Sequence, residues 1–108
     1  MRERLYRDAS GHLTLDLDRD YPRQDVDIAA VKAVLEACFE AQFGRPWEDV
    51  LGDMAAQQFN CGSNKFELFW DHWLGLRIVS LRLQGDTLLT EMARYFEAKP
   101  PPLKPAPP

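Results

Sequence analysis

The densest group of side chains with chemical potential is an acidic run that begins after residue 15. Its members are Asp16, Asp18, Asp20, Asp25 and Asp27. Residues 16, 18, 20 and 27 have the spacing of ligands in an EF-hand calcium loop. Tyr21, however, stands where the sharp turn of such a loop needs glycine, and the residues before the run resemble a strand. The pattern therefore favours an exterior acidic surface over a metal site, and we expect no metal or other cofactor.

A cysteine and a histidine suggest a second kind of chemistry. Cys61 precedes Gly62 in a predicted turn, and His72 stands close to it in the sequence. A thiol whose pKa is lowered by an imidazole is a nucleophile, but the sequence identifies no third residue to orient the pair. A small enzyme or ligand-binding protein is therefore kept as the alternative. Its pocket would contain Cys61, Trp70, His72 and Trp73.

The sequence lacks the common catalytic motifs. It has no glycine-rich phosphate loop, no Cys-x-x-Cys, no His-Glu-x-x-His and no Gly-x-Ser-x-Gly. Only two histidines are present for acid–base or metal chemistry. We therefore expect a protein that is not an enzyme.

Charge is distributed unevenly along the chain. The net charge is −4, and residues 8–53 hold eleven acidic and four basic residues. An acidic protein binds nucleic-acid phosphates poorly, so we expect no nucleic-acid partner. The most apolar stretch, residues 73–83, contains two arginines and is shorter than the ~20 residues of a membrane helix. With no apolar run after Met1, the sequence predicts a cytoplasmic protein with no membrane partner and with free thiols.

The first element expected to position these residues is a hairpin. Residues 1–7 can form a strand, and residues 12–18 alternate between leucine and polar side chains after a turn that contains Gly11. The leucines would face the core. Thr14, Asp16 and Asp18 would then face water, as in a sheet with one exposed side.

Helical spacing of apolar residues predicts a helix from Asp25 to about Phe43. Asp25 or Asp27 is the expected N-cap, and Gly44 with Pro46 would end the helix. Residues 46–51 then resemble a short second helix with proline in its first turn. A last helix is expected to open at Gly85–Asp86.

Strands are expected between these helices. Residues 57–60 resemble a short strand, although 54–64 can also be read as a loop, and two strands occupy 65–83 with a break near residue 71. This order predicts one α+β domain over residues 1–98, with an antiparallel sheet of four to five strands and two main helices packed on it. Residues 99–108 hold six of the eight prolines and are expected to form a disordered tail.

Without a catalytic constellation, the sequence favours recognition of another protein. We expect a small acidic interaction module, of the inhibitor or immunity type, that binds a partner with a basic surface. A homodimeric structural protein is a further alternative. Besides the acidic run, the partner-binding residues would be Glu36, Glu40, Trp47 and Trp70.

Overall fold

The computed structural model describes residues 4–18, 26–48, 50–71, 73 and 75–104. Its elements in chain order are β1 (Leu5–Arg7), β2 (Leu13–Asp16), α1 (Ile28–Phe39), β3 (Ala41–Glu48), β4 (Met54–Cys61), β5 (Asn64–Asp71), β6 (Gly75–Ser80), the 3-10 turn η1 (Leu83–Gly85) and α2 (Asp86–Ala98). The strands form one antiparallel sheet in the order β1-β2-β6-β5-β4-β3. The α+β class and the two main helices are confirmed, but the sheet has six strands instead of four to five.

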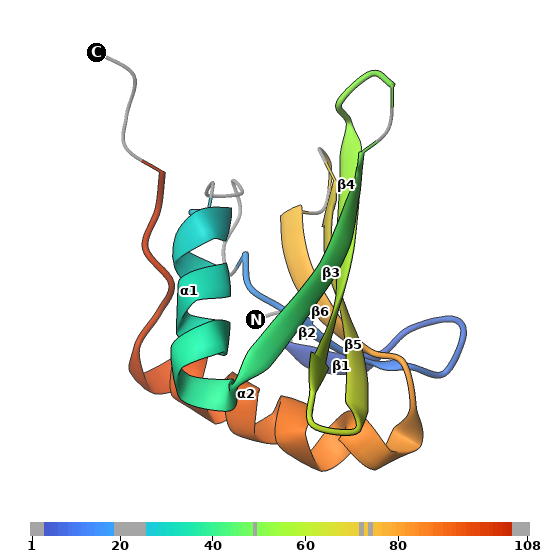
Figure 1. The fold of residues 1–108 in the computed structure, drawn as a ribbon, viewed down its shortest axis with the longest axis vertical. Coiled ribbons are helices and arrows are strands. Elements are labelled where there is room, and N and C mark those ends of the chain that lie inside the picture. The colour runs from blue at the N-terminus through green and yellow to red at the C-terminus, as the bar shows by residue number, and fades with distance from the viewer. Residues whose placement is uncertain (1–3, 19–25, 49, 72, 74, 105–108) are drawn as a thin grey trace.

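Both helices pack on the same face of the sheet (Figure 1). Val31 and Leu35 of α1 share one buried core with Met92 and Phe96 of α2. The strands contribute residues of a single face, because side chains two apart in a strand point the same way. Phe59 of β4, for example, is 1% exposed and stacks between two other rings in this core, at centroid distances of 4.9 and 5.3 Å.

Helix α1 begins after Asp27, one of the two predicted caps, and ends four residues earlier than the predicted Phe43. The side chain of Asp27 accepts a hydrogen bond from the backbone nitrogen of Ala30, at 3.2 Å, which is the N-cap geometry. Asp25, the other expected cap, lies outside the described residues. The helix stops at Phe39 because Glu40 adopts a left-handed conformation, with φ 56°, and turns the chain directly into β3.

The prediction of a short helix at residues 46–51 is wrong. Residues 46–48 belong to β3, and 50–53 form the turn into β4. Proline has a fixed φ and no N–H, which an edge strand tolerates as well as a first helical turn does. Pairing with β4 decides between these two outcomes, since Phe43 faces the buried Phe59 and Trp47 lies opposite Ala56.

The central strands follow the predicted pattern. Residues 54–64, which the sequence left open, are strand β4 and a tight turn at Gly62 into β5. The break near residue 71 is confirmed, and β6 begins at Gly75, whose φ of 83° favours glycine. The last helix opens at Asp86 as expected, although no side chain caps it.

The prediction that one side of β2 faces water is also wrong. Thr14 is 1% exposed and Asp16 is 3% exposed, so both faces of this strand are buried. β2 pairs with β1 on one side and with β6 on the other, and it is therefore an interior strand of the sheet. Alternation of leucine with polar residues identified the strand correctly but misassigned the environment of its polar side.

The described part of the proline-rich segment contacts the domain, which the expectation of a disordered tail did not include. The described part, residues 99–104, runs beside α1 (Figure 1), and Leu103 forms an isolated antiparallel bridge with Val26. The carbonyl oxygen of Pro102 accepts a hydrogen bond from the backbone nitrogen of Asp27, at 2.8 Å. Proline lacks a donor but keeps its acceptor, which allows this pairing.

Candidate functional site: a cleft between α1 and the β3–β4 hairpin

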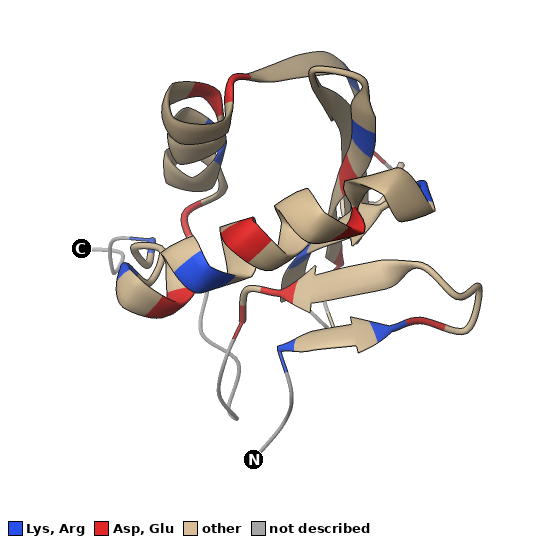
Figure 2. Cartoon of the chain, turned by 90° about the horizontal axis from the view of Figure 1, so that it is seen from below, with Lys and Arg blue, Asp and Glu red and all other residues tan. Residues whose placement is uncertain are grey.

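The structure does not gather the acidic run into one exterior surface. Asp16 and Asp18 are buried, at 3% and 6% exposure, and Asp27 caps α1. Asp20 and Asp25 lie outside the described residues. Acidic residues elsewhere are spread over both helices and the sheet (Figure 2).

Asp18 has an internal role that accounts for its burial. Its Oδ2 atom accepts a hydrogen bond from the backbone nitrogen of Leu76 in β6, at 2.6 Å. The Oδ1 atom of Asp16 accepts a bond from the backbone nitrogen of Asp18, at 3.1 Å. These carboxylates hold the chain after β2 against the neighbouring strand. Within the described part of the chain, no three metal-ligating side chains cluster.

The alternative pocket is not assembled either. Cys61 pairs with Asn64 at one end of the β4–β5 ladder, whereas Trp70 pairs with Ala55 near the other end. Six strand residues separate the two positions, which corresponds to roughly 20 Å. Burial raises the pKa of the Cys61 thiol, which opposes formation of the thiolate nucleophile. His72 lies outside the described residues.

An apolar cleft lies between α1 and the β3–β4 hairpin. Glu40 joins α1 to β3 at the base, and the two elements diverge from there (Figure 1). The resulting cleft contains about 440 Å³ of empty space, part of it open to solvent. Its lining comprises Ile28, Lys32, Pro46, Trp47, Glu48, Ala55, Ala56, Gln57, Leu68, Trp70 and Leu76.

The sheet register explains why the cleft is hollow. Its floor is formed by Leu68, Trp70 and Leu76, from the helix-facing side of β5 and β6. On the same face of β4, Ala55 lies directly opposite Trp70. Its small side chain leaves space that α1 does not fill, because the helix contributes only Ile28 and Lys32 to the lining.

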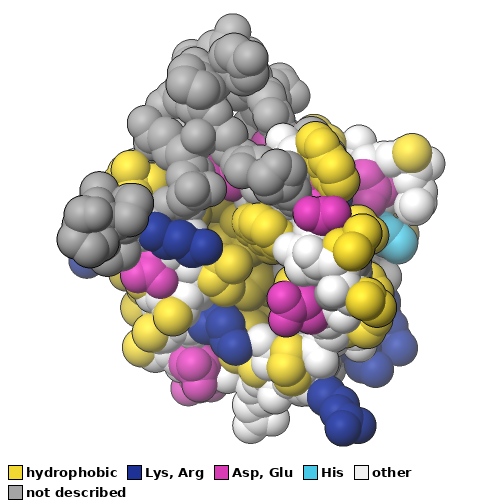
Figure 3. Space-filling model, turned by 90° about the horizontal axis from the view of Figure 1, so that it is seen from above, with side chains coloured by type: hydrophobic (Ala, Val, Ile, Leu, Met, Phe, Trp, Pro, Cys, Tyr) yellow, Lys and Arg dark blue, Asp and Glu magenta, His cyan; other side chains and the backbone are white. Residues whose placement is uncertain are grey.

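Four exposed apolar side chains lie at the same end of the molecule as this cleft, and one of them, Trp47, also lines it. Trp47 is 53% exposed, Val50 101%, Leu51 81% and Trp73 68%. They share one end of the molecule, because the β3–β4 turn and the β5–β6 turn meet where Met54 pairs with Asp71. Seen from above, hydrophobic side chains line a depression at this end (Figure 3). Exposed apolar side chains gathered at one end of a molecule make that end a candidate interaction surface.

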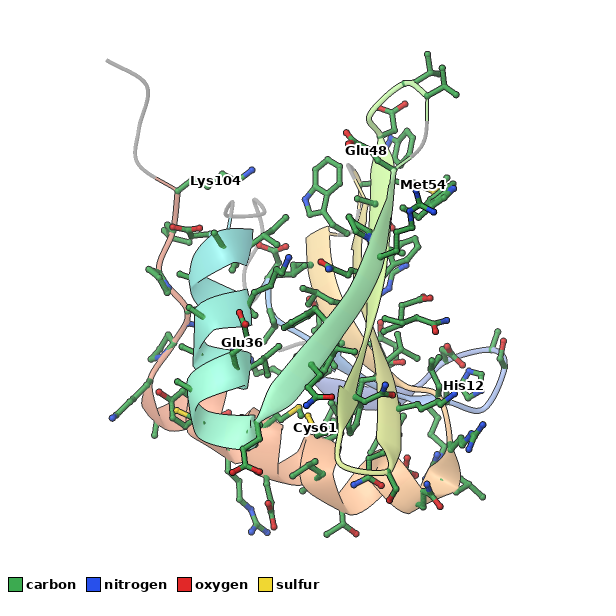
Figure 4. All side chains as sticks on the ribbon, viewed as in Figure 1. His12, Glu36, Glu48, Met54, Cys61 and Lys104 are labelled. Carbon is green, nitrogen blue, oxygen red and sulfur yellow. The ribbon has the colours of Figure 1, made fainter. Side chains whose placement is uncertain are left out.

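The two walls of the cleft carry opposite charge. Lys32 lies on the α1 wall, with its ammonium nitrogen 5.0 Å from the centroid of the Phe43 ring. Lys104 lies on the same side, on the segment that runs beside α1, whereas Glu48 lies on the hairpin (Figure 4). The hairpin sequence from 48 to 53 contains three acidic residues and no basic one.

Two of the residues that the sequence predicts to bind a partner lie at this cleft. Trp47 and Trp70, the two predicted anchors, both line the cleft. Glu36 and Glu40 are exposed on or after α1 but do not line it. Val50 and Leu51 were missed; two exposed aliphatic residues before Gly52 would have stood out if residues 46–51 had been recognised as a hairpin.

In the described part of the chain, no helix has the length and apolar character needed to cross a membrane. No family model matches the sequence, and no curated protein or solved structure shows significant similarity to it.

Proposed function

We propose that this protein is a protein-interaction module that docks its partner at the apolar end formed by the cleft and the β3–β4 hairpin. The observation that supports the proposal is a group of four side chains, all more than half exposed, at the end of the molecule that holds the cleft: Trp47, which lines it, and Val50, Leu51 and Trp73 in the neighbouring turns. Tryptophan is enriched at binding hot spots, and burial of such side chains supplies affinity. The buried Asp16 and Asp18 contribute nothing to this surface.

Side chains, and not the backbone of β3, are expected to make the contact. β3 is an edge strand, and an edge strand can add a strand from a partner. Here Pro46 lacks an N–H, and the register shifts between Phe43 and Pro46. The carbonyl oxygen of Gly44 already accepts a bond from Nε2 of Gln57, at 2.7 Å. These features make strand addition unfavourable and leave the cleft as the docking feature.

Site-specific photo-crosslinking in cells tests this proposal. A benzophenone amino acid at position 51 should give a crosslinked protein adduct. The matched control is position 83, because Leu83 is 75% exposed and lies in η1, at the opposite end of the sheet from the hairpin tip. An adduct at 51 and none at 83 supports the module; equal adducts at both positions, or no adduct at 51, would contradict it.

A further inference from the structure

We propose that the occupant of the cleft is a second copy of this chain, which inserts its β3–β4 hairpin tip while its own cleft receives the tip of the first. This inference rests on the proposed function and names the partner. It follows from three properties of the described residues: the location of tip and cleft, their apolar character and their charge.

The hairpin tip and the cleft are located where a self-complementary surface needs them. A twofold dimer needs one surface that contains both members of each contact, so that each copy gives and receives the same element. The tip, with Val50 and Leu51, and the cleft, with Trp70 and Leu76, lie at the same end of the molecule. This shared location is what a twofold dimer requires if each copy is to insert its tip into the cleft of the other.

The apolar character of the tip is unusual for a hairpin turn. Val50 and Leu51 are almost fully exposed beside Gly52, at a position where turn sequences commonly place polar residues. The opposing cleft floor is formed by leucine and tryptophan side chains. Insertion would remove both apolar surfaces from water simultaneously.

The charges around the cleft favour a second copy of this chain, over other apolar segments, as the occupant. Lys32 of α1 lines the cleft and Lys104 lies on the segment beside α1, whereas the hairpin carries Glu48 and Asp53. The Glu48 carboxylate is located at the tip, since a Cβ atom at Gly52 would lie 3.7 Å from its Oε1. Twofold docking puts the acidic hairpin of one copy against the basic wall of the other, twice in each dimer.

The first part of the test is the solution mass. Sedimentation equilibrium of the purified chain should give twice 12.4 kDa, falling to 12.4 kDa in the variant Leu51→Asp. Leu83→Asp is the control and should keep the dimer mass. Circular dichroism of each variant verifies that it is folded. A monomeric wild-type protein, or a Leu51→Asp variant that remains dimeric, would overturn the proposal.

Mixing two charge variants distinguishes contacts between copies from contacts within one chain. Glu48→Lys places two lysines opposite each other at each contact, and Lys32→Glu places two glutamates there. Each variant alone should dissociate at least tenfold more readily than wild type. An equimolar mixture should restore the dimer, because both contacts then join opposite charges. Glu67→Lys, which makes the same charge change on β5 outside the cleft, should leave dissociation unchanged.

The outcomes separate this inference from the proposed function. A mixture that fails to restore the dimer would reject the second copy as occupant. If the purified chain is monomeric while position 51 crosslinks to a different protein in cells, the interaction module stands and the twofold dimer is excluded. A monomeric chain with no adduct at position 51 would contradict both the twofold dimer and the interaction module.

Discussion

At the scale of single residues, Asp18 shows how burial changes the meaning of a carboxylate. Its Oδ2 atom lies 2.6 Å from the Leu76 nitrogen, and the residue is only 6% exposed. A buried charge is costly unless hydrogen bonds compensate for the lost water. Asp18 is therefore expected to stabilise the fold and to contribute nothing to partner encounter.

Replacement of Asp18 by alanine should lower the free energy of unfolding by about 1–3 kcal/mol, because the buried N–H of Leu76 loses its acceptor. Urea denaturation followed by tryptophan fluorescence measures the change. Glu36→Ala, at an exposed position of α1, is the control and should change stability by less than about 0.5 kcal/mol. Equal stabilities for the two variants would show that the Asp18 bond is unimportant.

The two thiols should react at very different rates. Cys38 is exposed and Cys61 is buried. Alkylation by iodoacetamide at neutral pH should therefore modify Cys38 first, and Cys61 only when the chain unfolds. Mass spectrometry over time identifies the modified residue, and the same reaction in denaturant provides the reference in which both react alike. Rapid modification of Cys61 in the native protein would contradict its burial.

The raised pKa of Cys61 also predicts the direction of a pH effect. Burial raises this pKa above its ordinary value of 9.0, so the folded protein holds the thiol proton more tightly than the unfolded chain does. The stability due to this linkage is complete below pH 9.0 and is lost as the pH rises above it. Cys61→Ala should remove this alkaline component from the melting curve, whatever its effect at neutral pH.

At the scale of elements, local periodicity identified the helices and the central strands, and pairing partners determined the rest. α1 and α2 carry buried residues at helical spacing, which is visible in the sequence. β3 has mostly exposed side chains and contains Pro46, so it lacks the signal of a strand. It forms because β4 lies beside it, and the pattern of residues 46–51 contains no information about that neighbour.

The contact between the proline-rich segment and α1 can be tested by truncation. A chain that ends at Lys99 loses the bond from the Asp27 nitrogen to the Pro102 carbonyl and the bridge of Val26 with Leu103. We expect a loss of about 0.5–1.5 kcal/mol in unfolding free energy, the net contribution of one such hydrogen bond. A chain ending at Lys104 keeps both contacts and is the control. Identical melting temperatures would show that the segment does not support α1.

At the scale of the whole molecule, the proposed twofold dimer links stability to concentration. Association of folded copies stabilises the native state by mass action, so the melting temperature should rise with protein concentration. Differential scanning calorimetry over a hundredfold range of concentration measures this. Leu51→Asp should melt at a temperature independent of concentration, and its melting temperature should equal the value that wild type approaches on dilution. Parallel concentration dependence in both proteins would contradict docking through the hairpin tip.

The order of residues along the chain carries enough information for the α+β class, for an aspartate N-cap on α1 and for the break near residue 71, because each depends on neighbours a few positions away. Burial of Asp16 and Asp18 and the hollow between α1 and β3 depend instead on which segments become adjacent after folding. A side chain meets water or protein according to contacts made across the sheet, and residues distant in sequence provide them. Periodicity records only that two sides of an element differ, so it could not distinguish an acidic exterior from a buried pair of carboxylates.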